Sequence, residues 1–189
     1  MVALALPAQL GAFMQQPIAD TDPTALLLLD IASGMVRDYL QMELDAVVGD
    51  VVLLEPVNGS NGVSVFLPEL PVTAVSLVET FDGTVWTTPT PLTYTISKRT
   101  GVISALPYTG VTWPYLSETW RVTYDHGYAV IPSTIIGVTL GVAARQWNTD
   151  NGIDLERIGG YQVKYSMEAD GFSPIEKKAL ARYVNPRIA

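Results

Sequence analysis

The sequence contains no cysteine and only one histidine, His126, among its 189 residues. Without cysteine there is no disulfide framework, no thiol nucleophile and no thiolate metal site. Asp125 precedes His126, but adjacent strand residues point to opposite faces, so this carboxylate is poorly placed to orient the imidazole as a general base. The sequence also lacks G-x-S-x-G and other nucleophile motifs. We therefore expect His126 to serve a turn, and we expect a protein that is not an enzyme and needs no cofactor.

Positive charge is scarce as well. Lysine and arginine number 11 against 19 aspartates and glutamates, a formal net charge of −8, and no basic run occurs. Proteins that bind nucleic acid through its phosphates show the opposite balance. An acidic surface beside DNA lets the DNA slide past without specific binding.

Long hydrophobic runs are absent, and none approaches the ~20 residues of a membrane span. The first ten residues are apolar but lack a positively charged segment, and Pro7 and Gln9 interrupt them. We expect this stretch to belong to the mature fold rather than to a signal peptide. Hydrophobic residues make up 48% of the chain and charged residues 16%, which is typical of an ordered globular protein.

A weak metal-site pattern surrounds Gly152, where oxygen-bearing side chains alternate as in a calcium loop. The glycine falls one position early for an EF-hand, and Gly159 occupies the expected position of the terminal carboxylate. We expect a solvated loop and no metal. The side chains in question are Asn148, Asp150, Asp154 and Glu156.

Alternation of apolar and polar residues predicts seven strands in the middle of the chain, separated by turn signals such as Asp82-Gly83. Val57–Gly62 is rich in asparagine and glycine and is expected to form a hairpin turn. Trp120, Val122 and Tyr124 alternate on one strand and are expected in the core. The predicted strands are Val51–Glu55, Val63–Leu67, Val72–Glu79, Val85–Thr88, Leu92–Ser97, Val102–Leu106 and Thr119–Asp125.

Helical patterns occur at both ends of the chain. Asp22 and Pro23 suit a helix start, and Ser173 with Glu176 forms a capping box before the last helix. Four helices are expected, at 4–15, 23–43, 132–148 and 173–185. The predicted fold class is α+β: a helical bundle formed by the N- and C-terminal helices (1–48 and 128–189, one discontinuous domain) with an inserted antiparallel β-rich subdomain (49–127).

Two of these helices carry more apolar residues than one buried face requires. On the helix at 23–43 the predicted apolar face is Leu28, Ile31, Ala32, Met35, Tyr39 and Met42, and Leu26 and Leu27 lie off it. The helix at 132–148 is apolar over most of its circumference. A central core helix is favoured there over a helix that packs partly against a neighbouring subunit. Ile135, Val138 and Val142 make up one of the two apolar faces of this helix.

Several strings in this order carry a resemblance to a known family. They are D-x-x-A-L-L-L-L-D-I-A-S-G-x-V-R-D-Y (Asp22–Tyr39), R-V-T-Y-D-H-G-Y-A-V-I-P (Arg121–Pro132), the long alanine-containing helix that follows, the polar strand Tyr161–Ser166 and an L-x-R-Y run (Leu180–Tyr183). Together they resemble the head-to-tail connector proteins of long-tailed bacteriophages, also called adaptor or head-completion proteins. The resemblance covers nearly the whole chain.

The resemblance implies a structural protein of the virion neck, made in the host cytoplasm and not bound to a membrane. Such adaptors form a dodecameric ring beneath the portal protein, extend the DNA channel and contact the next neck or tail-completion protein. By this resemblance the portal contact is expected at Arg182, Tyr183, Pro186 and Arg187. The ring interface is expected at Leu26, Leu27, Ile135, Val138 and Val142.

One alternative function remains open. Trp113 and Tyr115 flank Pro114 in a predicted loop, where exposed aromatic rings could stack on sugar. This feature is typical of a β-rich carbohydrate- or receptor-binding module of a virion.

Overall fold

A computed structural model describes residues 2–59, 62–106, 114, 116–148, 155–158, 161–164 and 171–184. The chain divides into two compact units. The helical unit comprises Met1–Gln41 and Ile131–Ala189, and the β unit comprises Met42–Val130. The boundaries between the units thus fall after residues 41 and 130, and the predicted boundaries were after residues 48 and 127.

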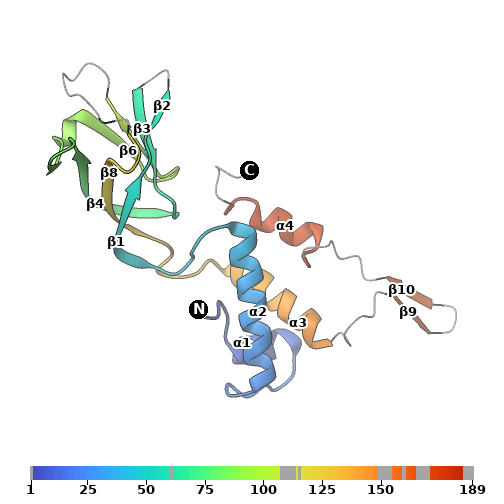
Figure 1. The fold of residues 1–189 in the computed structure, drawn as a ribbon. Coiled ribbons are helices and arrows are strands. Elements are labelled where there is room, and N and C mark those ends of the chain that lie inside the picture. The colour runs from blue at the N-terminus through green and yellow to red at the C-terminus, as the bar shows by residue number, and fades with distance from the viewer. Residues whose placement is uncertain are drawn as a thin grey trace. The chain divides into compact units, whose positions relative to one another are not determined.

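The predicted fold class, a helical bundle framed by the terminal helices, is wrong because the chain is rich in β-sheet and its first and last helices are short (Figure 1). The described residues form ten strands in three antiparallel sheets and four α-helices. Helices α1 (Pro7–Met14) and α4 (Pro174–Leu180) have eight and seven residues. About two turns each is too short for the repeated apolar layers of a bundle.

The β unit contains two four-stranded antiparallel sheets, with strand orders β1-β8-β4-β5 and β2-β3-β7-β6. All seven predicted strands are present, and the hairpin predicted at 57–62 also contributes a short strand, β2. The bounds are β1 Val47–Leu54, β2 Val57–Gly59, β3 Gly62–Phe66, β4 Val72–Phe81, β5 Trp86–Thr87, β6 Tyr94–Ser97, β7 Val102–Ala105 and β8 Trp120–His126, with a 3₁₀ turn at Pro91–Thr93.

The core of the β unit includes the inward face of β8. Trp120, Val122 and Tyr124 are fully buried, which confirms their predicted role, and Val65 and Ile103 of the second sheet are buried as well. The polar ends of the two aromatic residues are satisfied. The indole N–H of Trp120 donates to the carbonyl of Pro114 at 3.0 Å, and the hydroxyl of Tyr124 accepts from the Glu69 N–H at 3.3 Å.

In the helical unit, α3 (Ser133–Asn148) is the central helix. It contacts α1, α2 (Pro23–Leu40) and α4, which agrees with the favoured prediction of a core helix. Between α3 and α4 lies a two-stranded antiparallel sheet, β9 (Leu155–Ile158) and β10 (Tyr161–Lys164). Strand β10 falls within the predicted strand at 161–166, whereas β9 was expected to be loop. No described helix is long and apolar enough to cross a membrane.

The start of α2 forms as predicted, but its buried face does not. Asp22 caps the helix by accepting from the N–H groups of Thr24 and Ala25 at 2.9 and 3.0 Å. Ile31, predicted to be buried, is exposed. Four successive leucines at 26–29 are compatible with more than one helical phase, so the pattern could not select the buried face. The apolar residues that α2 buries are Ala25, Leu29, Ala32, Val36 and Leu40.

Candidate interaction surfaces

The candidate functional features of the part of the chain that the structure describes are exposed surfaces. Within these residues no group of three or more His, Cys, Asp or Glu could hold a metal ion. Of the calcium-loop candidates, Glu156 lies in β9, Asn148 ends α3, and Asp150 and Asp154 lie outside the described residues.

His126 belongs to the core and not to a turn, so that part of its prediction is wrong. It is 4% exposed at the end of β8, and its ring stacks on Tyr124 with centroids 5.0 Å apart. Its Nε2 lies 3.4 Å from a carboxylate oxygen of Asp50, while Nδ1 is buried without a partner among the described residues. Asp125 lies on the opposite face, as predicted, where its carboxylate accepts from the Gly49 N–H at 2.8 Å. The sequence could not identify Asp50 because the partner strand was unknown.

Gly127 makes the turn that follows. Its φ is +82°, a conformation that favours glycine, and a Cβ there would fall on the carbonyl of Asp45. The Gly127 N–H donates to the Pro71 carbonyl at 3.1 Å, and the Tyr128 N–H donates to the Leu44 carbonyl at 2.9 Å. Asp45 and Tyr128 also form a parallel bridge. The segments by which the chain enters and leaves the β unit are therefore paired inside that unit.

One face of the sheet β1-β8-β4 is turned away from the core, and we call it the outer sheet face. Leu53, Arg121 and Glu79 form one row across the three strands, and Val51, Thr123 and Leu77 form another. Val51, Leu53 and Leu77 are exposed, the first two by 57% and 53%. Exposed apolar residues gathered on one face of a sheet make that face a candidate interaction surface. The outer sheet face comprises Val51, Leu53, Glu55, Leu77, Glu79, Arg121, Thr123 and Asp125.

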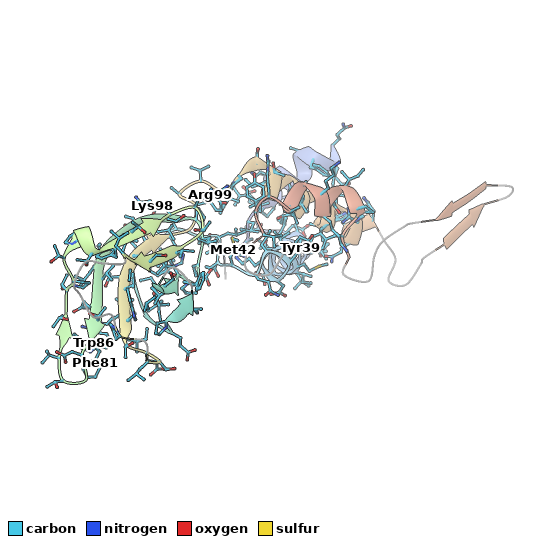
Figure 2. All side chains as sticks on the ribbon, turned by 90° about the horizontal axis from the view of Figure 1, so that it is seen from above. Tyr39, Met42, Phe81, Trp86, Lys98 and Arg99 are labelled. Atoms are coloured by element: carbon cyan, nitrogen blue, oxygen red, sulfur yellow. The ribbon has the colours of Figure 1, made fainter. Side chains whose placement is uncertain are left out.

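An ion pair lies at the middle of this face. Arg121 donates to both carboxylate oxygens of Glu79, at 2.7 and 2.9 Å, and its guanidinium carbon lies 4.4 Å from the centre of the Trp86 ring. Trp86 packs in turn on Phe81, with ring centroids 5.2 Å apart (Figure 2). The hydrogen bonds from Arg121 hold the pKa of Glu79 below its ordinary value, and they raise the pKa of Arg121. The sequence could not predict this cluster, because it depends on which strands are neighbours.

A second exposed apolar area lies on the helical unit. Leu26, Leu27 and Ile31 of α2 are exposed, Leu27 by 59%, and we call these three residues the leucine surface. Leu26 and Leu27 are thus accessible, and their role in a ring interface stays a prediction. The other predicted ring-interface residues, Ile135, Val138 and Val142, are not accessible, because all three are buried within the core of the helical unit.

The residues predicted to contact the portal lie at the C-terminal end. Arg182 donates to the hydroxyl of Thr134 at 2.7 Å, and its guanidinium carbon lies 4.7 Å from the centre of the Tyr183 ring. Pro186 and Arg187 lie outside the described residues, as do Trp113 and Tyr115, the candidate sugar-binding residues.

Helix α4 is attached to α3 by a bidentate ion pair. Arg145 donates to the two carboxylate oxygens of Glu176 at 2.8 and 2.9 Å, and the predicted capping box of Ser173 and Glu176 is present. Burial by itself raises the pKa of Glu176, but hydrogen bonds from Arg145 and Ser173 outweigh it and leave the pKa below its ordinary value. Ile175, in the first turn of α4, is 81% exposed.

Comparison with known proteins gives a likeness of fold. No protein-family model matches the chain, and no curated protein matches it. A solved structure that is similar is described as "Neck of empty GTA particle computed with C6 symmetry", from a gene transfer agent, which is a phage-like particle. The likeness covers 100% of this chain and 95% of that chain, with 16% identity and a TM-score of 0.50. At this identity the likeness shows a common fold.

Proposed function

We propose that this chain is a structural protein of the neck of a phage-like virion. In that place, copies of it form an adaptor ring that joins the portal of the capsid to the tail and extends the DNA channel. The next neck or tail-completion protein binds the far side of the ring. The proposal assigns the chain no enzymatic activity and no cofactor.

The observation that carries the proposal is the end-to-end likeness to a chain of the GTA neck. Because 100% of this chain and 95% of that chain are aligned, the likeness covers both the helical and the β units. A fold by itself does not define a function. Here the same place in a virion is supported independently by the connector-like strings at Asp22–Tyr39 and Arg121–Pro132.

The distribution of charge supports a passage for DNA. The β unit has nine carboxylates and three cationic side chains, a net charge of −6, within a chain of net charge −8. A channel that carries DNA through must not bind it, and an acidic wall prevents binding through phosphates.

Exposed apolar residues support assembly into a ring. The leucine surface on α2 offers apolar area that the helical unit leaves uncovered. A head-to-tail contact repeated around an axis closes into a ring. The C6 symmetry described for the GTA neck is compatible with six or twelve copies, so the expected dodecamer fits this symmetry.

Electron microscopy of particles tests the neck assignment. Particles assembled without this chain should have capsids that lack attached tails, and adding the purified chain should restore a ring at the portal vertex. Unchanged tail attachment without the chain contradicts the proposal.

Substituting Leu26 and Leu27 together with serine should prevent ring formation. Val2→Ser, at an apolar position of the same unit that is at least as exposed, serves as the control.

Portal contact is tested by truncation after Val184. This variant retains the contact of Arg182 with Thr134 and removes Pro186 and Arg187. We expect weaker binding to portal-bearing particles without tails. A second variant, Arg182→Ala, reports on Arg182 separately. Undiminished binding of both variants contradicts the assignment of the portal contact to this segment.

A further inference from the structure

We propose that the exposed side of α4 in one copy of this chain docks on the outer sheet face of a second copy. This inference rests on the ring of the proposed function and names the surfaces that meet in it. Helix α4 and the outer sheet face belong to different units of the chain. Each copy can therefore bind one neighbour through α4 and another neighbour through its outer sheet face. Such a contact is heterologous, and its repetition builds a ring when the rotation between copies closes.

The outer sheet face combines exposed apolar side chains with carboxylates. Val51, Leu53 and Leu77 provide the exposed apolar area. Glu79 is already neutralised by Arg121. Asp125 and Glu55, which is exposed directly after β1, have no cationic partner among the described residues. The face therefore offers exposed apolar side chains and two carboxylates that have no cation beside them among the described residues.

The exposed side of α4 is complementary to it. Ile175 is 81% exposed in the first turn of the helix, and Lys178 is exposed three residues later on the same side. The one carboxylate of the helix, Glu176, is bound by Arg145 and so does not oppose an acidic partner. An apolar side chain next to a cation thus meets an apolar area next to carboxylates.

The charges of the β unit and of the segment that contains α4 favour a second copy as the partner. The β unit has a net charge of −6, whereas residues 171–184 hold three cationic side chains against one carboxylate. Two β units would repel each other. A basic α4 approaching an acidic β unit is attracted, and complementary charge selects both the partner and its orientation.

The absence of cysteine makes a crosslinking test direct. Two tagged forms of the full chain are made, one with Leu53→Cys and one with Ile175→Cys, and they are mixed with a thiol-specific bismaleimide. We expect a crosslinked product that contains both tags. The control pairs Ile175→Cys with Arg99→Cys. Figure 2 shows Arg99 on a different side of the β unit from Phe81 and Trp86, which lie beside the Arg121 ion pair. A mixed product no more abundant than in the control overturns the proposal.

A charge reversal with rescue tests the electrostatic part. In the crosslinking pair, Lys178→Glu should lower the yield by about tenfold, because it replaces attraction with repulsion. Glu55→Lys on the other chain should restore the yield. Arg99→Glu makes the same change in net charge elsewhere and should have no effect. Loss of yield without rescue, or no loss, overturns the proposed pairing.

A variant that carries both Leu53→Cys and Ile175→Cys in one chain distinguishes contact between copies from contact within one chain. If this variant forms only the intrachain crosslink when it is diluted, the proposal fails. These assays use the purified chain alone, so their outcome is separate from that of the particle assay. A negative crosslinking result with a positive particle result removes this contact and leaves the neck assignment intact.

Discussion

Both carboxylate oxygens of Glu79 accept hydrogen bonds from Arg121, at 2.7 and 2.9 Å, on the outer sheet face. The two residues are cross-strand partners on β4 and β8, and Trp86 of β5 covers the guanidinium. The pair thus connects three neighbouring strands of one sheet. It also neutralises the charges of Arg121 and Glu79 between the exposed apolar side chains of Leu53 and Leu77, so a partner can cover this pair without leaving it as an unpaired charge.

The stabilisation from this ion pair should depend on pH. The pKa of Glu79 is lower in the folded chain than its ordinary value. Its stabilisation is therefore complete above the ordinary glutamate pKa and is lost as the pH falls through the folded-state pKa. We expect Glu79→Gln to unfold in less denaturant than the parent at neutral pH, and the difference to disappear in acid.

Denaturant titrations at a series of pH values measure this effect. Glu118→Gln is the matched control, since Glu118 is exposed and has no ion pair among the described residues. A difference between Glu79→Gln and the parent that stays constant across the pH range contradicts the prediction.

Gly127→Ala should be more destabilising than Gly49→Ala. Both glycines have positive φ, +82° and +71°, so each alanine should cost about 1–2 kcal/mol for backbone strain. Only at Gly127 would the added Cβ collide with backbone, at Asp45. That collision should add roughly 1–3 kcal/mol. Chemical unfolding of the two variants measures the difference, and equal losses would contradict the role given to the paired entry and exit segments.

Glu176→Gln should release α4 from α3. The substitution removes the charge that Arg145 binds and weakens the capping box, at a cost of roughly 2 kcal/mol. Hydrogen exchange of the amides of Lys177 and Ala181 should become faster. Lys178→Gln, an exposed change on the same helix, should leave exchange unchanged. Undiminished protection in Glu176→Gln would show that the ion pair does not hold the helix.

His126→Ala should reduce stability and leave assembly intact. The imidazole is buried against Tyr124, and its removal should cost about 2–4 kcal/mol through lost packing. Thermal unfolding measures the loss. Ring formation by the same variant, at a temperature where it is folded, should match the parent. Loss of an enzymatic activity on this substitution would overturn the expectation that the chain has none.

Local signals in the sequence predicted much of the secondary structure. Asp22 and Ser173 cap their helices as expected, because a capping side chain interacts with backbone only two or three residues away. The alternation of Trp120, Val122 and Tyr124 identified a core strand, because a period of two puts these residues on one face. Such features depend on neighbours in sequence and can be read without the fold.

Features that depend on distant segments could not be predicted. The leucines at 26–29 allowed several helical phases, and only packing against α3 decided that Leu29 is buried and Leu27 exposed. The pairing of Glu79 with Arg121 required β4 and β8 to be neighbours. The fold class was wrong for a related reason. The sequence pattern predicted terminal helices at 4–15 and 173–185, whereas α1 and α4 have only eight and seven residues, too few to frame a bundle.

The amino-acid sequence alone determined the charge, the absence of thiols, the helix caps and the alternation of the strands, because these are properties of composition or of short-range geometry. Only the tertiary structure decided which apolar residues remain exposed, that Asp50 rather than Asp125 lies beside His126, and that Arg121 meets Glu79. Those results depend on strand order and register, which bring together residues far apart in the chain.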